Sequence, residues 1–154
     1  MRIERAIEEA FVTLLGTVFP SGTYNILHQE EDALLNVEPE DEDEPKITKP
    51  SLIVTATDAG RAIKRTAVRL IRTTVTYRVN SKLPEGQEAA FTATCTALEE
   101  LLERGDLETS LSNATVHCFG AGREGSAVTS SIGLIRTHTH TLNLTAVLKR
   151  YAVA

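Results

Sequence analysis

One segment of the chain matches a nucleotide-binding pattern: Gly120–Gly125, with the sequence GAGREG, fits G-x-G-x-x-G and follows a run of strand-forming residues. In a dinucleotide site a helix begins directly after these glycines, and its N-terminus binds the pyrophosphate. An acidic residue about 20 positions further on binds the ribose. Here a β-branched, serine-rich stretch follows, and no acid occurs after Glu124. We therefore interpret the segment as a flexible hairpin loop.

His138 and His140 are the residues whose spacing best suits a metal ion. Two positions apart on a strand, their side chains point to the same face about 7 Å apart, where both can bind one zinc ion. A third ligand would have to be His117, Cys118 or His28, and nothing in the sequence brings one near. The competing interpretation is that this face of the strand runs past the core into a subunit contact. A small zinc-binding enzyme or metal-binding module is thus an alternative hypothesis; we expect no cofactor.

No other pattern indicates catalysis. The chain lacks G-x-S-x-G, and no pair of carboxylates stands out beyond the acidic segment described below. The two cysteines, Cys95 and Cys118, are too few for a disulfide framework and lack metal-type spacing, so we expect thiols. The prediction is a protein that is not an enzyme. A cytoplasmic ligand-binding domain is a further alternative, although no residues specify a ligand.

Charge is distributed unevenly along the chain. The net charge is -5, yet residues 30–44 contain nine acids and no base, so the rest carries +4. Clustered like charges and prolines predict an exposed acidic loop over residues 30–49. Seven bases and no acid lie between Arg61 and Lys82. The candidate interface or channel residues are therefore the acids Glu40, Asp41, Glu42, Asp43 and Glu44 and the arginines Arg65, Arg69, Arg72 and Arg78.

The elements that must position these residues follow from hydrophobic spacing. Apolar residues at helical intervals predict an amphipathic helix over residues 2–19, ended by Pro20, and then a short strand over 23–28. A strand begins at Ser51, and the residues Asp58-Ala59-Gly60 predict a turn.

The run over residues 65–80 changes phase, because Val68 and Leu70 share one parity while Ile71 and Val75 share the other. A β-bulge near Leu70–Ile71 would keep both sets on the core face. The same bulge would bring the four candidate arginines together on the outer face.

A second helix is predicted over residues 85–104, followed by strands over 115–119, 127–132 and 134–148. The last shows the clearest alternation, with leucines on one face and threonines on the other. This order predicts one α+β domain over residues 1–154, with a mixed or mostly antiparallel sheet, a long β-hairpin and two helices packed on one face. No stretch approaches the roughly 18 apolar residues that span a bilayer, and the beginning lacks the apolar region of a secretion signal.

In their order, these elements resemble the small tail-terminator and neck (head-tail joining) proteins of tailed bacteriophages. The shared features are the N-terminal amphipathic helix, a strand that starts in a Pro-Ser-Leu-type step at Pro50–Val54, a long hairpin, a mid-chain helix and a C-terminal group of strands. The resemblance covers most of residues 1–150 as an ordered pattern, without a diagnostic short motif. The acidic stretch is an insertion that this pattern does not require.

The resemblance implies a homo-oligomeric ring, commonly of six subunits, that caps the finished tail tube and joins it to the head-side connector. Its expected partners are the tail tube protein, a connector or stopper protein, and genomic DNA that passes through the channel without sequence recognition. A connector or stopper role in the same neck is an alternative. The expected location is the neck of the virion, after assembly in the host cytoplasm, with no membrane contact.

Overall fold

The structure, a computed structural model, describes residues 2–20, 22–28, 50–63, 66–80, 87–132 and 135–151. The acidic stretch and Arg65 lie outside these residues. In chain order the helices and strands are α1 (Ile3–Gly16), β1 (Asn25–His28), β2 (Ser51–Arg61), β3 (Arg69–Asn80), α3 (Gln87–Leu102), α4 (Leu107–Leu111), β4 (Val116–Arg123), β5 (Val128–Ile132) and β6 (Ile135–Leu148), followed by a 3-10 turn at Lys149–Tyr151.

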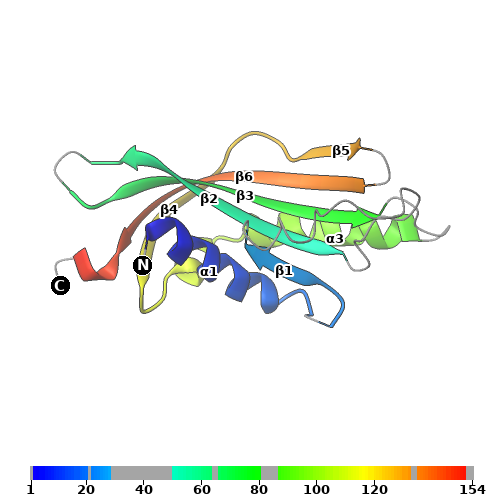
Figure 1. The fold of residues 1–154 in the computed structure, drawn as a ribbon, viewed down its shortest axis with the longest axis horizontal. Coiled ribbons are helices and arrows are strands. Elements are labelled where there is room, and N and C mark those ends of the chain that lie inside the picture. Colours follow the sequence, from blue (N-terminus) through cyan, green and yellow to red (C-terminus); the bar gives the residue numbers. More distant parts are fainter. Residues whose placement is uncertain are drawn as a thin grey trace, which may run out of the picture.

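The six described strands form one mixed sheet in the order β1-β2-β3-β6-β4 (Figure 1). The short β1 runs parallel to β2, and every other pair is antiparallel. Two strands share the outer edge of β6: β5 pairs with residues 135–139 and β4 with residues 142–148. The far end of the long β2–β3 hairpin extends beyond α1 (Figure 1).

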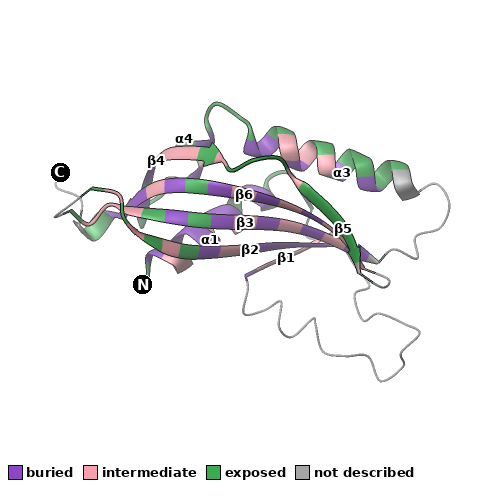
Figure 2. Ribbon diagram, turned by 90° about the horizontal axis from the view of Figure 1, so that it is seen from above, coloured by how far each residue is buried: buried purple, intermediate pink, exposed green. Residues whose placement is uncertain are grey.

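The described helices all lie on one side of the sheet (Figures 1 and 2). Helix α1 buries a stripe that recurs every three or four residues, and this stripe packs on the sheet together with residues of α3 and α4. The fully buried members of the core include Ile7, Phe11, Leu15, Leu52, Val54, Val75, Leu98, Leu111, Leu142 and Leu144. The predicted α+β class, with a long hairpin and helices on one face, is confirmed. The five-residue α4 was not predicted from the sequence.

The bulge predicted in the third strand is wrong. From Leu70 to Val79 burial alternates without interruption, and Leu70 is 40% exposed rather than in the core. The irregularity lies in the partner strand, between Asp58 and Gly60, where Gly60 has a φ of 119°. Glycine tolerates this left-handed conformation, so β2 absorbs the extra residue and β3 stays regular. The predicted turn at 58–60 is therefore part of β2, which continues to Arg61.

The glycine motif also differs from its prediction as a hairpin loop. Strand β4 runs to Arg123, so the first four residues of the motif lie in the sheet. A side chain at Gly120 would meet the hydroxyl of Thr145 at 3.2 Å, which explains the glycine by close packing between β4 and β6. The next element is strand β5, not a helix. The segment thus lacks the helix N-terminus that a dinucleotide site uses.

Candidate functional site

Strand β6 does bring His138 and His140 together on the helix side of the sheet. Their ring centroids are 4.7 Å apart at 80°, and the two residues are 8% and 1% exposed. On β3, Tyr77 lies opposite His138 and Val75 opposite His140. Helix α3 lies over this end of the sheet, where Phe91 packs against Tyr77 at 5.4 Å between ring centroids. The predicted continuation of the leucine face past the core therefore ends beneath α3 of the same chain.

The polar atoms of the two rings are unequally satisfied. His138 Nδ1 lies 2.9 Å from the hydroxyl of Thr129 on β5. No described residue forms a hydrogen bond with His138 Nε2 or with either nitrogen of His140. Burial lowers the pKa of His138, and burial together with the neighbouring His138 and Arg123 lowers the pKa of His140 to about 4. Both imidazoles are therefore neutral at pH 7.

The suggested third metal ligands are placed elsewhere. His117 stacks on Phe119 at 5.5 Å between ring centroids, Cys118 belongs to the core cluster, and His28 lies against Glu8. Within the described part of the chain, no group of three His, Cys, Asp or Glu side chains is arranged to hold a metal ion. The histidine pair is thus a buried, neutral polar cluster. It brings two potential metal ligands together without a third.

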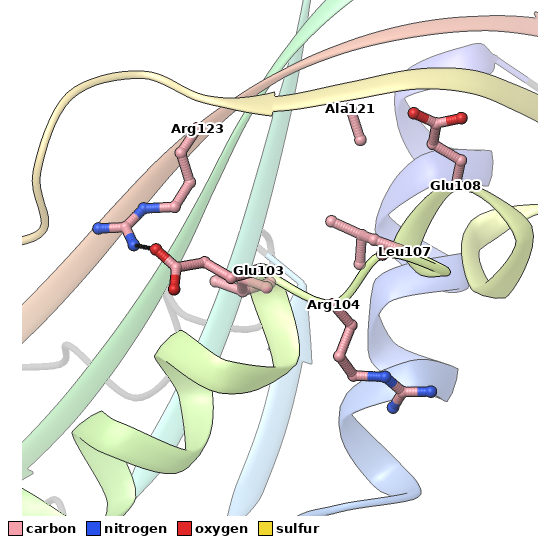
Figure 3. A pocket seen from close by; sticks show the side chains of 8 residues that line it. Glu103, Arg104, Leu107, Glu108, Ala121 and Arg123 are labelled. Carbon is pink, nitrogen blue, oxygen red and sulfur yellow. Dashed lines mark hydrogen bonds and ion pairs between the residues drawn. The ribbon is translucent and has the colours of Figure 1, made fainter.

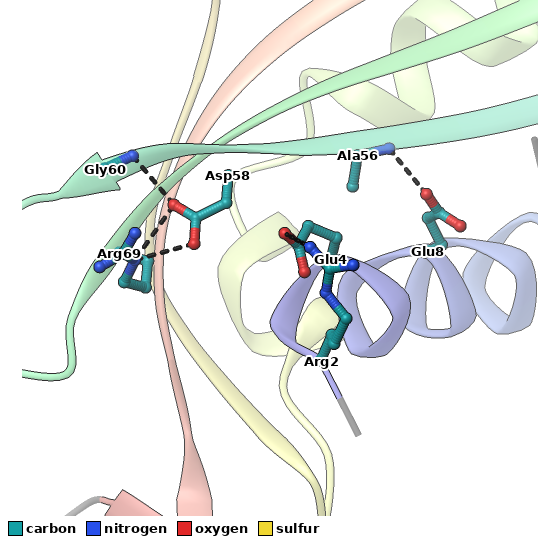
Figure 4. A network of polar contacts seen from close by, with 7 residues as sticks. All are labelled: Arg2, Glu4, Glu8, Ala56, Asp58, Gly60 and Arg69. Atoms are coloured by element: carbon teal, nitrogen blue, oxygen red, sulfur yellow. Dashed lines mark hydrogen bonds and ion pairs between the residues drawn. The ribbon is translucent and has the colours of Figure 1, made fainter.

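A second buried polar cluster, which the sequence did not suggest, lies where β1 ends. Glu8 of α1 is only 7% exposed. Its Oε2 accepts the backbone N–H of Ala56 at 2.9 Å (Figure 4). Its Oε1 is 3.3 Å from His28 Nδ1. Because β1 pairs with β2 only as far as Val54, the carboxylate satisfies a backbone donor that the neighbouring strand no longer reaches. No signal in the sequence distinguishes Glu8 from the neighbouring Glu9.

The candidate arginines lie on opposite faces of the sheet. Arg69 is on the helix side, where its Nε donates to both carboxylate oxygens of Asp58 at 3.0 and 2.9 Å (Figure 4). Burial raises the pKa of Asp58, but hydrogen bonds from Arg69 and the Gly60 amide outweigh it, and the net pKa is lowered. Arg72 lies on the outer face, 3.1 Å from Glu124. The prediction that these arginines share one surface is wrong for Arg69, because β3 has no bulge to turn it outward.

The outer face of the sheet carries rows of hydroxyl side chains, and no described helix covers it (Figure 1). Cross-strand register places Thr55, Thr74 and Thr141 in one row. In the next row the hydroxyls of Thr76 and Thr139 are 3.2 Å apart. Arg78 also lies on this face, opposite Thr137. Among the described residues, this face is therefore largely polar with arginines at intervals, and shows no arrangement that would activate a nucleophile.

A hollow of 340 Å³ lies between the end of α3, α4 and β4 (Figure 3). Arg123, the cation of the glycine motif, borders it and pairs with Glu103 and with Glu99, the latter at 3.2 Å. These carboxylates hold β4 against α3 and leave Arg123 neutralised, so it does not attract a phosphate group. The hollow is open and lacks the buried polar groups of a specific ligand site.

The chain matches no protein-family model and no curated protein. Its function must therefore be inferred from the surfaces themselves. No helix among the described residues is long and apolar enough to cross a membrane.

Proposed function

We propose that this chain is a non-enzymatic ring subunit of a tailed-bacteriophage neck, a tail terminator that caps the tail tube and joins it to the head-side connector. The observation that carries the proposal is the one-sided fold. Strands β2, β3 and β6 have 11, 12 and 14 residues, and their outer face has no helix over it in the described chain. A subunit that works through contacts needs such surfaces and needs no reactive groups.

The projecting end of the β2–β3 hairpin supports a role in contacts. Ile63 is 53% exposed and Leu70 is 40% exposed, so two large apolar side chains of this hairpin face solvent. Exposed apolar residues on a protruding element are suited to a protein contact. In a ring with head-to-tail symmetry, such a projection on one subunit contacts a different surface of the next.

Charge supplies a second line of support. Arg72 and Arg78 lie on the outer face, and the nine acids of residues 30–44 belong to the same chain. In a heterologous ring, a basic surface of one subunit meets an acidic one of its neighbour. Acids that faced the channel would keep DNA from adhering during passage. We propose six subunits, the tail tube and a connector or stopper as neighbours, and a place in the virion neck.

Two other functions are less well supported. A connector or stopper of the same neck would use the same surfaces and differ only in its neighbours, and no observation favours it. A zinc enzyme would need a third ligand beside His138 and His140, and none of the described residues provides one.

The test is native mass spectrometry of the purified chain, alone and with phage tail tubes. We expect a closed ring, either free or formed on the tube end. Arg72→Glu should lower ring formation and leave the circular dichroism spectrum unchanged, since Arg72 and Glu124 are both largely exposed. The matched control is Arg104→Glu, also an exposed arginine paired with one acid, but on the helix side. A chain that stays monomeric in both settings would overturn the proposal.

A further inference from the structure

The edges of the sheet differ in whether their outward backbone groups are hydrogen-bonded within the chain. Backbone N–H and C=O groups on a bare edge can pair with a strand of another molecule, and proteins commonly cap or charge such edges. Along β2, beyond the end of β1, the N–H of Ala56 binds the carboxylate of Glu8. At this position the edge is therefore capped by a side chain of the same chain.

The first part of the β4 edge is capped as well. There the outward backbone groups belong to Val116 and Cys118, whose partners Leu148 and Ala146 are even-numbered residues of β6 and direct their own backbone away from β4. The backbone N–H and side chain of Asn113 bind the C=O and N–H of Val116 at 3.0 and 3.1 Å. The hydroxyl of Ser112 accepts the N–H of Cys118 at 3.0 Å and lies 3.1 Å from its carbonyl oxygen. The N–H and C=O groups of Val116 and Cys118 thus all have a local partner. Further along, Ala121 and Arg123 also direct their backbone outward, and there the charged side chain of Arg123 pairs with Glu99 and Glu103 of α3.

Strand β5 differs from the edges of β2 and β4. Glu124 donates its N–H to the carbonyl of Thr141, which shows that the odd-numbered residues of this part of β6 direct their backbone toward β4 and β5. In β5 their partners are Val128, Ser130 and Ile132, so the backbone groups of Thr129 and Ser131 point away from the sheet. No other described residue forms a hydrogen bond with these outward backbone groups. Residues 128–131 are all exposed (Figure 2).

The chemistry of β5 matches a second copy of itself. Between Ser126 and Ile135 there is no charged residue and no proline, so the strand lacks two of the features that commonly protect an edge. Antiparallel pairing about Ser130 places Thr129 opposite Ser131 of the second copy, hydroxyl beside hydroxyl. Val128, which is 64% exposed, comes opposite position 132, an isoleucine. A chain with net charge -5 repels its own copy in general, and this neutral strand adds no charge to that repulsion.

Two contacts hold β5 ready for this pairing. The hydroxyl of Thr129 lies 2.9 Å from His138 Nδ1, and the hydroxyl of Ser130 lies 2.9 Å from that of Thr137. Both tie β5 to β6 and fix the direction of its outward backbone groups, so little conformational freedom remains to be lost on association.

We propose that β5 is a self-association edge, on which two copies of the chain pair antiparallel about Ser130 through the outward backbone groups of Thr129 and Ser131. The contact is two-fold and uses the same residues of both copies. It differs from the head-to-tail contact of a ring and does not rest on the proposed function. Where rings form, it joins subunits of two rings.

The deciding experiment uses opposite charges at the symmetry centre. Because Ser130 faces itself, Ser130→Lys or Ser130→Glu alone puts two like charges face to face and should weaken association about tenfold or more. An equimolar mixture of the two variants should restore it, and native mass spectrometry should show a complex with one copy of each. Thr92→Lys and Thr92→Glu, at an exposed position on α3, are the matched controls and should change nothing.

Each result separates this contact from the ring. Variants that associate as the unaltered chain does, or a mixture that fails to restore association, would overturn the self-association edge and leave a ring untouched. Two-fold complexes that depend on residue 130 but never grow to a ring would remove the ring and leave the edge. If the variants misfold by circular dichroism, hydrogen exchange on the unaltered chain decides. The Thr129 and Ser131 amides should exchange about tenfold or more slowly at high protein concentration than at low, and equal rates would overturn the pairing.

Discussion

The two ends of the buried face of β6 are equally hidden from solvent but differ in chemistry. Toward the C-terminus, Leu142 and Leu144 are both 0% exposed and belong to the apolar core cluster. Toward the start of the strand, His138 and His140 are 8% and 1% exposed beneath α3. Burial of leucine stabilises the fold at any pH. Burial of imidazole leaves polar atoms without partners and favours the neutral form of the ring. Its contribution to the stability of the fold is therefore smaller than that of leucine and depends on pH.

The largest difference should come from shortening a leucine at the apolar end. Leu144→Ala removes buried methyl groups and leaves a cavity between β6 and the helices, so the free energy of unfolding should fall by about 2–5 kcal/mol. Denaturation by guanidinium at pH 7 and at pH 5 measures it, and the loss should be similar at both values.

Asn143→Ala is the matched control for this change. Asn143 is the next residue of β6, exposed on the outer face, where its side chain donates to Glu124 at 3.3 Å. Its substitution should change the free energy of unfolding by less than about 0.5 kcal/mol. An equal loss of unfolding free energy for Leu144→Ala and Asn143→Ala would mean that the outer face is covered in solution, contrary to the one-sided fold.

The histidine end should respond to acid. The pKa of His140 is about 4 in the folded chain and near 6.5 when unfolded, so the unfolded state binds the extra proton first as pH falls. The stability linked to this group is complete above about pH 6.5 and is lost as pH falls toward 4, with a total of about 1–3 kcal/mol. Denaturation measured between pH 7 and pH 4 should show this slope.

His140→Leu is the variant that sharpens the result. Leucine continues the apolar series of Leu142 and Leu144 and carries no titrating group, so this part of the pH dependence should disappear. Carboxylates elsewhere also contribute below pH 5, so the comparison with the unaltered chain carries the test. A pH profile unchanged by the substitution would show that His140 is not buried as a neutral imidazole.

The contrast shows what the sequence could predict and what it could not. Period-two alternation identified β6, and its histidines fell on the buried face, because side-chain direction in a strand follows parity alone. The same rule was misapplied to β3, since the bulge that resets the hairpin register lies at Gly60 in the other strand. The outward backbone groups of β5 and the carboxylate cap at Ala56 both arise where a strand continues beyond the end of its neighbour. The ends of neighbouring strands are determined by pairing between segments distant in the sequence, and local sequence carries no signal for that pairing.

Apart from the Asn143→Ala control, the smallest effect should come from the hydroxyl that supports the histidine end from β5. Thr129→Val keeps the shape and the β-branch of the side chain but removes the partner of His138 Nδ1 at 2.9 Å. Because Thr129 is exposed and water can replace it, the free energy of unfolding should fall by only about 0.5–1.5 kcal/mol. Thr129→Ser retains the hydroxyl and should lose less. Equilibrium denaturation at pH 7 ranks the two variants, and a valine variant as stable as the serine variant would show that the hydrogen bond does not contribute. The polar end of the buried face would then be held by packing under α3 alone, as the leucine end is by its own neighbours.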